Sequence, residues 1–164
     1  MDSDRLLSSL LASGQTTDII EPFTGATLYS LPTSTEDDVD AVFDEARRAQ
    51  RMWADTPVSV RSAIMLRFHD ALLDDRQSVL DLLQRETGKA RKDANEEVLD
   101  VCITARHYAR DARRLLRPLR RLGALPGLVG VVERRVPFGV VGVIVPWNYP
   151  LPLSISAASS ARRA

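Results

Sequence analysis

The amino-acid sequence predicts an α/β fold in which a layer of helices precedes the first strand of a parallel sheet. Apolar side chains recur at helical spacing through most of residues 34–117. Residues 139–145 then form a nearly continuous run of glycine and β-branched residues, which is typical of a strand covered on both faces. Helices followed by such a strand are typical of the entry to a parallel α/β sheet.

The fold is expected to open with two short extended segments, residues 17–20 and 27–31, joined by a turn around Gly25. A helix is then predicted to begin at Ser34, whose hydroxyl can cap the helix while the carboxylate of Asp37 answers three residues later. Apolar residues repeat at helical spacing from Val39 to Trp53, so one face of this helix should be apolar.

Further helices should follow the Thr56-Pro57 pair, because proline is well tolerated at a first helical position. The second of them is expected to end at Gly88, a typical left-handed residue at a helix C-terminus. A longer helix is predicted from about Ala90 to Arg117, and a strand over residues 128–136.

The long helix has an apolar seam with alternating steps of three and four residues. Its members are Val98, Val101, Ala105, Tyr108, Ala112, Leu115 and Leu119. Such a seam suits either a coiled coil or packing inside the same fold. Its short length and the nearby Pro118 favour packing inside the fold.

Length and composition are those of one globular domain. The chain has 164 residues, 45% apolar and 27% charged, with 22 basic and 22 acidic side chains. This balance provides no overall field to attract nucleic acid or an anionic membrane. The single cysteine, Cys102, excludes an internal disulfide framework, and the polar N-terminus does not resemble a signal peptide. We therefore expect a cytoplasmic protein that binds neither nucleic acid nor membrane.

Residues 136–161 contain no charged side chain, and this stretch is long enough to cross a bilayer. Four prolines interrupt this stretch, and each removes an amide donor that hydrocarbon cannot replace. A strand, a loop and a helix explain the stretch better than a membrane span does.

Asn148 is the polar side chain of greatest interest, because it follows the predicted strand at the end where ligands bind in parallel α/β sheets. Its amide is a neutral donor that can stabilise an oxygen as it becomes negative during attack on a carbonyl. Alternatively, Asn148 caps the next helix. The residue types alone leave both roles open.

Six segments occur in the order seen in the aldehyde dehydrogenase superfamily. They are Glu-Pro-Phe-Thr-Gly (21–25), the helix with Trp53, Glu-Thr-Gly-Lys (86–89), Glu-Glu-Val (96–98), Pro-Phe-Gly-Val-Val-Gly (137–142) and Pro-Trp-Asn-Tyr-Pro (146–150). Over residues 17–153 the chain resembles NAD(P)-dependent members, and among them the succinate-semialdehyde branch. The resemblance implies a flexible N-terminus (1–16), a partial cofactor-binding domain that starts a truncated Rossmann-like sheet (17–153) and a divergent tail (154–164).

In this resemblance Asn148 matches the oxyanion-hole asparagine, and Ile144, Val145, Pro146 and Trp147 match the strand end and turn that line the NAD or NADP site. The implied reaction oxidises an aldehyde to the acid. A cysteine thiolate attacks the aldehyde, hydride passes to the nicotinamide, and a glutamate-activated water releases the product.

The family's nucleophilic cysteine and glutamate base have no match in this sequence. We therefore expect a truncated or frame-shifted product that is inactive alone and aggregates or is partly ordered, whereas full-length relatives form homo-oligomers. Cys102 lies in an apolar helical pattern and is expected to be a buried small hydrophobe. His69 and His107 lack metal-ligand spacing, so no metal site is expected.

Two non-catalytic alternatives remain. Residues 1–60 carry a net charge of −7 and residues 106–135 a net charge of +7. Arginines at helical spacing within the basic part (106, 110, 113, 117 and 120) could contact phosphates or an acidic partner, although a solvated helix face explains them better. The strand over residues 128–136 could instead serve as a subunit-interface element.

Overall fold

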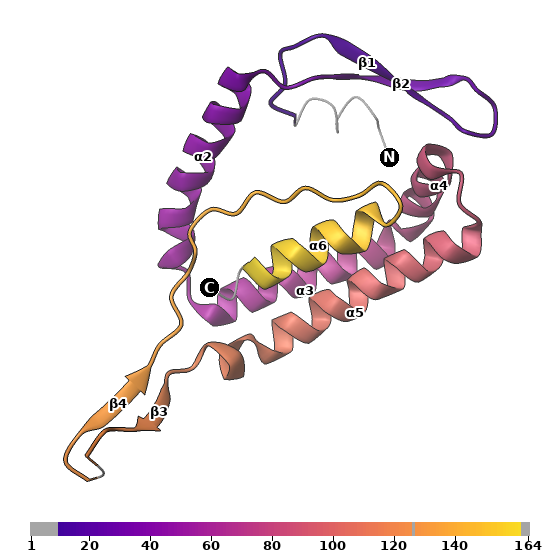
Figure 1. Ribbon diagram of the computed structural model, residues 1–164. Helices are drawn as coiled ribbons and strands as arrows, with labels where there is room; N and C mark the ends of the chain where they lie inside the picture. Colours follow the sequence, from indigo (N-terminus) through magenta and orange to yellow (C-terminus); the bar gives the residue numbers. More distant parts are fainter. Residues whose placement is uncertain (1–9, 126, 162–164) are drawn as a thin grey trace.

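The computed structural model describes residues 10–125 and 127–161 (Figure 1). Most of the predicted N-terminal segment, residues 1–9, and the end of the predicted tail, residues 162–164, lie outside the described part. The elements are β1 (Thr16–Ile20), β2 (Thr27–Pro32), α2 (Glu36–Ala54), α3 (Val58–Asp74), α4 (Arg76–Thr87), α5 (Arg91–Leu116), β3 (Leu119–Leu122), β4 (Gly130–Glu133) and α6 (Pro150–Ala161).

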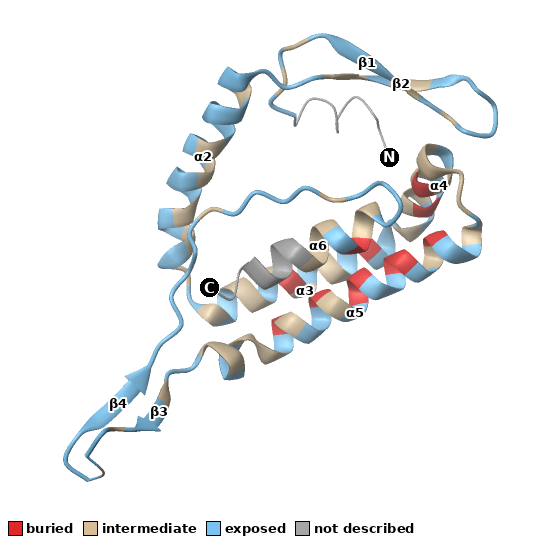
Figure 2. Ribbon diagram, in the orientation of Figure 1, coloured by how far each residue is buried: buried red, intermediate tan, exposed pale blue. Residues whose placement is uncertain are grey.

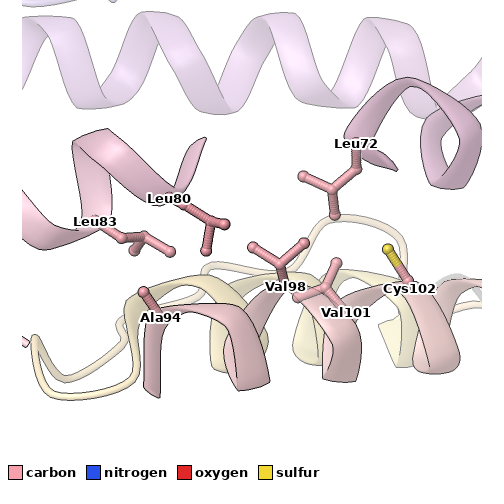
Figure 3. Close-up of a cluster of buried hydrophobic side chains, with 7 residues drawn as sticks. All are labelled: Leu72, Leu80, Leu83, Ala94, Val98, Val101 and Cys102. Atoms are coloured by element: carbon pink, nitrogen blue, oxygen red, sulfur yellow. The ribbon is translucent and has the colours of Figure 1, made fainter. Parts of the chain in front are cut away.

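Helices α3, α4, α5 and α6 pack side by side and contain the core (Figures 1 and 2). Its main cluster joins three leucines of α3 and α4 to small and β-branched residues of α5 (Figure 3). The members are Leu72, Leu80, Leu83, Ala94, Val98, Val101 and Cys102. Leu151 and Ile155 of α6 pack against this cluster, so the charge-free C-terminal stretch contributes a helix to the core.

The seam of the long helix is packed inside the fold, as the sequence favoured. Val98, Val101 and Ala105 are buried among neighbouring helices of the same chain. Leu119, however, does not continue the helix and instead begins β3. The reason is local, because Arg117 precedes Pro118 and is extended (φ −64°, ψ 142°), as steric contact with a following proline requires.

The cap of α2 lies one residue later than predicted. Thr35, not Ser34, accepts from the main-chain amide of Asp38, and Asp38 returns a bond to the amide of Thr35. The Asp38 carboxylate also accepts from the main-chain amide of Ser13, which lies 25 residues away. This tertiary contact selects Asp38 over Asp37 as the partner in the cap.

The predicted apolar face of α2 is covered only in part, since Phe43 and Trp53 are half-buried. None of the residues of α2 is buried, and Val39 and Val42 are among the exposed large apolar side chains. The helix stands apart from the packed group in Figure 1 and connects the β1–β2 hairpin to α3.

Helices α3 and α4 confirm the predicted pair, and α4 ends at Gly88 in the left-handed region, with φ 73°. The strands form two antiparallel hairpins, β1–β2 and β3–β4. Strand β4 lies within the predicted strand over residues 128–136, but β3 was not predicted.

The predicted strand over residues 139–145 is wrong. The segment runs as chain without strand pairing between β4 and α6, and most of its side chains are exposed (Figure 2). A strand requires a neighbour to bond its amides and carbonyls, and the described residues supply none there. Its β-branched composition alone does not form a ladder.

Candidate functional site

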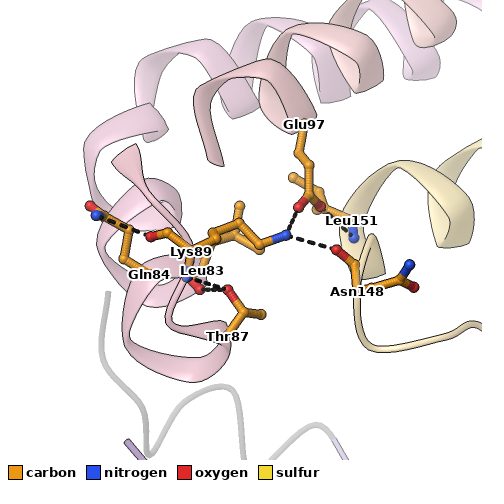
Figure 4. A network of polar contacts seen from close by, with 7 residues as sticks. All are labelled: Leu83, Gln84, Thr87, Lys89, Glu97, Asn148 and Leu151. Atoms are coloured by element: carbon orange, nitrogen blue, oxygen red, sulfur yellow. Dashed lines mark hydrogen bonds and ion pairs between the residues drawn. The ribbon is translucent and has the colours of Figure 1, made fainter. Parts of the chain in front are cut away.

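Asn148 lies in the turn between the unpaired segment and α6, close to α4 and α5 (Figure 4). Its main-chain carbonyl accepts a hydrogen bond of 3.0 Å from Nζ of Lys89, which lies 59 residues earlier. The side-chain amide of Asn148 extends away from this contact (Figure 4). The turn is therefore fixed through its main chain while the side-chain amide is left for other contacts.

Lys89 is placed by the end of α4. The left-handed Gly88 turns the chain out of the helix, and the carbonyl of Lys89 accepts from Nε2 of Gln84 at 3.5 Å. The Lys89 ammonium forms an ion pair with Glu97 and lies 5.3 Å from the centroid of the Tyr149 ring. Burial lowers the pKa of this ammonium, while the charge of Asp93 acts in the opposite direction.

Glu97 lies on α5 at the edge of the core cluster. It is charged and yet buried, with an exposed fraction of 2%. One carboxylate oxygen pairs with Lys89, and the other accepts from the main-chain amide of Leu151 at 3.4 Å (Figure 4). Its burial is therefore compensated by both a cation and a backbone donor, as a buried carboxylate requires.

The N-terminus of α6 has few free donors. Pro150 and Pro152 lack an amide hydrogen, so the first turn offers only the amides of Leu151 and Leu153. Leu151 donates to Glu97, and Leu153 donates to the carbonyl of Tyr149 at 3.4 Å. The first-turn amides are thus bonded to partners other than the Asn148 side chain, which disfavours the alternative that Asn148 caps this helix.

The residues predicted to line the dinucleotide site, Ile144, Val145, Pro146 and Trp147, are consecutive apolar residues that lead into this turn. Ile144 and Trp147 are exposed large apolar residues. The N-terminus of α6 does not fit the pyrophosphate of a dinucleotide, because phosphate binding at a helix start needs free main-chain amides.

The roles of Lys89 and Glu97 were missed in the sequence, where both belonged only to matched motifs. One signal was present for Glu97. It lies four residues before Val101, so both residues share the face of α5 that packs into the core. A carboxylate on a buried helix face needs a partner, and Lys89 is one of only two lysines in the chain.

Cys102 is buried in the core, as expected, and burial raises the pKa of its thiol. His69 contacts Asp70, and His107 lies 3.4 Å from Asp111. Among residues 10–125 and 127–161, no group of three metal-ligating side chains is brought together. No helix in this part of the chain is long and apolar enough to cross a membrane.

The arginines of the basic segment are exposed on α5 and the chain that follows it. Arg114 pairs with Asp111 at 3.2 Å, and Arg121 pairs with Glu133 at 2.7 Å. The first pair lies within α5 and the second joins β3 to β4, and neither includes one of the five arginines predicted to form a basic face.

Comparisons with known proteins show the family. The model of the aldehyde dehydrogenase family matches residues 10–162. A protein of Mycolicibacterium smegmatis named "Putative succinate-semialdehyde dehydrogenase (NADP+)" is 51% identical over 146 residues, which cover 89% of this chain and 28% of that protein. The chain thus spans less than a third of this relative's length.

Solved structures share the fold. The NAD-dependent benzaldehyde dehydrogenase of Corynebacterium glutamicum superposes with a TM-score of 0.82 and 32% identity, over 92% of this chain and 32% of that one. The NADP-dependent glyceraldehyde-3-phosphate dehydrogenase of Bacillus halodurans, complexed with NADP, gives a TM-score of 0.84 and 28% identity, over 92% and 32%. The predicted α/β class is confirmed, and the chain spans about a third of each neighbour's length, although its described strands form antiparallel hairpins and not a parallel sheet. The chain belongs to the aldehyde dehydrogenase family.

Proposed function

We propose that this chain supplies the N-terminal, cofactor-facing part of an enzyme that oxidises succinate semialdehyde to the acid with NADP. The observation that carries the proposal is the 51% identity to the Mycolicibacterium smegmatis protein. NAD is the alternative acceptor, because one structural neighbour is NAD-dependent. Residues 17–153 would form the cofactor-binding part, and residues 154–164 a divergent tail.

Asn148 is proposed to donate its side-chain amide to the aldehyde oxygen as negative charge develops there. A neutral donor suits this task because it holds the charge without protonating the oxygen. Three features of the turn support this role: it follows the exposed strip 144–147, its main chain is fixed by Lys89, and its side-chain amide points away from that contact.

Ile144, Val145, Pro146 and Trp147 are proposed to cover one side of the bound dinucleotide. When bound, the nicotinamide supplies the hydride acceptor. The apolar strip contributes contact area and excludes water from the ring, whereas the pyrophosphate must find its amides elsewhere in the enzyme. We propose that the chain alone does not turn over substrate, since no residue here matches the family's nucleophilic cysteine or glutamate base.

Steady-state assays test this function in two preparations. The 164-residue chain alone, mixed with succinate semialdehyde and either NAD or NADP, should produce no reduced cofactor. A hybrid of residues 1–153 with the remaining sequence of the Mycolicibacterium smegmatis relative should be active. In that hybrid Asn148→Ala should lower kcat by about 10²–10³, the usual effect of losing an oxyanion donor. An active chain alone, or an Asn148→Ala hybrid with full kcat, would refute these assignments.

A further inference from the structure

We propose that Lys89 and Glu97 are positioning residues for Asn148, and that they act through the main chain of the turn from Asn148 to Leu151. This inference rests on the proposed function of Asn148. The two side chains do not reach the proposed reacting atoms themselves. They hold the backbone from which the Asn148 amide projects.

Lys89 and Glu97 form hydrogen bonds to the main chain of the turn at two residues that are three positions apart. Nζ of Lys89 donates to the carbonyl of Asn148 at 3.0 Å, and Oε2 of Glu97 accepts from the amide of Leu151 at 3.4 Å (Figure 4). Because Lys89 and Glu97 also form an ion pair with each other, the two hydrogen bonds belong to one connected network, the Lys89–Glu97 unit. Fixing the peptide groups on this turn fixes the direction in which the Cα–Cβ bond of Asn148 points.

Lys89 and Glu97 are both held by the packed helices. Lys89 directly follows Gly88 at the end of α4, and its own carbonyl is held by Gln84. Glu97 lies on α5 within the packed helical group. Hydrogen bonds between charged and neutral groups are stronger than neutral ones, so this unit resists movement better than two neutral contacts would.

The proposed catalytic role of Asn148 requires its side-chain amide to be held in a fixed position. A donor that stabilises developing charge must be held within about 0.5 Å of its productive position, and a displacement of about 1 Å can lower the rate about 10²-fold. The structure shows which contacts hold this turn in place. Among the described residues, Lys89 and Glu97 provide the hydrogen bonds that join the main chain of this turn to the parts of the chain before it.

The test uses the hybrid enzyme and the double substitution Lys89→Met with Glu97→Gln, which removes both charges and the donor to Asn148. The matched control is Lys92→Met with Glu96→Gln, an exposed pair on the same helix whose charged atoms lie 4.0 Å apart. We expect the Lys89/Glu97 variant to lower kcat about 10–10²-fold with little change in KM for NADP. The control should leave both unchanged.

A second background separates positioning from folding. In an Asn148→Ala hybrid, the Lys89/Glu97 substitutions should cause no further loss of kcat, because the group that they position is already missing. A general loss of folded enzyme would lower kcat equally in both backgrounds, and that result would overturn the proposal. A wild-type kcat in the Lys89/Glu97 variant would also overturn the proposal. If Asn148→Ala still lowers kcat in that case, the proposed function of Asn148 stands. If Asn148→Ala leaves kcat unchanged, both the positioning role and the proposed function of Asn148 are refuted.

A measurement without turnover gives an independent readout. In the 164-residue chain, the side-chain amide resonances of Asn148 can be assigned by NMR, with Asn148→Ala identifying them by their disappearance. The Lys89/Glu97 substitutions should shift these resonances, and the Lys92/Glu96 control should not. Unchanged resonances in the Lys89/Glu97 variant would show that the turn keeps its position without the pair, which would overturn the proposal.

Discussion

Removing one charge of the Lys89–Glu97 pair should lower the free energy of unfolding more, for each charge removed, than removing both charges together. The side chain of Glu97 is 1% exposed and that of Lys89 is 12% exposed. Lys89→Met leaves a buried anion bonded only to the Leu151 amide, and we expect a loss of about 3–5 kcal/mol in the free energy of unfolding.

Glu97→Gln should cost less, about 1–3 kcal/mol, because the ammonium keeps the Asn148 carbonyl and the Tyr149 ring as partners. The double variant buries no charge, so its loss should be only about 1–2 kcal/mol. The sum of the two single losses should therefore exceed the double loss by roughly 2–7 kcal/mol, and this difference is the coupling between the side chains.

Urea unfolding followed by far-UV circular dichroism measures the cycle, provided that the dependence of the free energy on urea is the same in all four proteins. The exposed Lys92–Glu96 pair is the matched control, and its coupling should be below about 0.5 kcal/mol. Additive losses at Lys89 and Glu97 would refute the reasoning, because they would show that neither charge depends on the other.

Two further predictions concern the stability of the fold. Hydrogen bonds from Thr35 and Ser13 lower the pKa of Asp38 from 3.8 to about 2, so its stabilisation is fully present above pH 3.8 and lost as the pH falls to about 2. Asp38→Asn should therefore lower the urea midpoint at pH 7. The difference in midpoint between the variant and the wild type should shrink as the pH falls from 3.8 to about 2, and a difference independent of pH would contradict this prediction. Leu80→Ala should cost about 2–5 kcal/mol, whereas Leu73→Ala at a 40% exposed position on α3 should cost roughly 1 kcal/mol, and equal losses would contradict the burial argument.

The place of Asn148 could be predicted from sequence because its signals are local. Proline and glycine around residues 139–150 mark an extended segment, a turn and a helix start. The residues that hold the turn could not be predicted in the same way. Lys89 is 59 residues from Asn148, and Glu97 is 54 residues from Leu151. Sequence spacing gives no distance between atoms on different helices.

The cap of α2 shows the same limit on a smaller scale. Ser34 and Thr35 each have an acid three residues later, so the local pattern permits either cap. The choice of Thr35 depends on Asp38, whose carboxylate also binds Ser13 from the preceding chain. A contact over 25 residues decides what local chemistry leaves open.

The helices, the left-handed end of α4 and the family could be predicted from the sequence, because helical periodicity, glycine at a helix end and ordered motifs are all properties of the chain read in order. The burial of charged side chains together and the covering of apolar segments depend on contacts between distant parts of the chain, which the fold brings about. Residues 139–145 have the composition of a central strand, yet they stay unpaired. A strand exists only where a second chain segment meets its hydrogen bonds, and Glu97 is buried only because folding brings Lys89 and Leu151 to it.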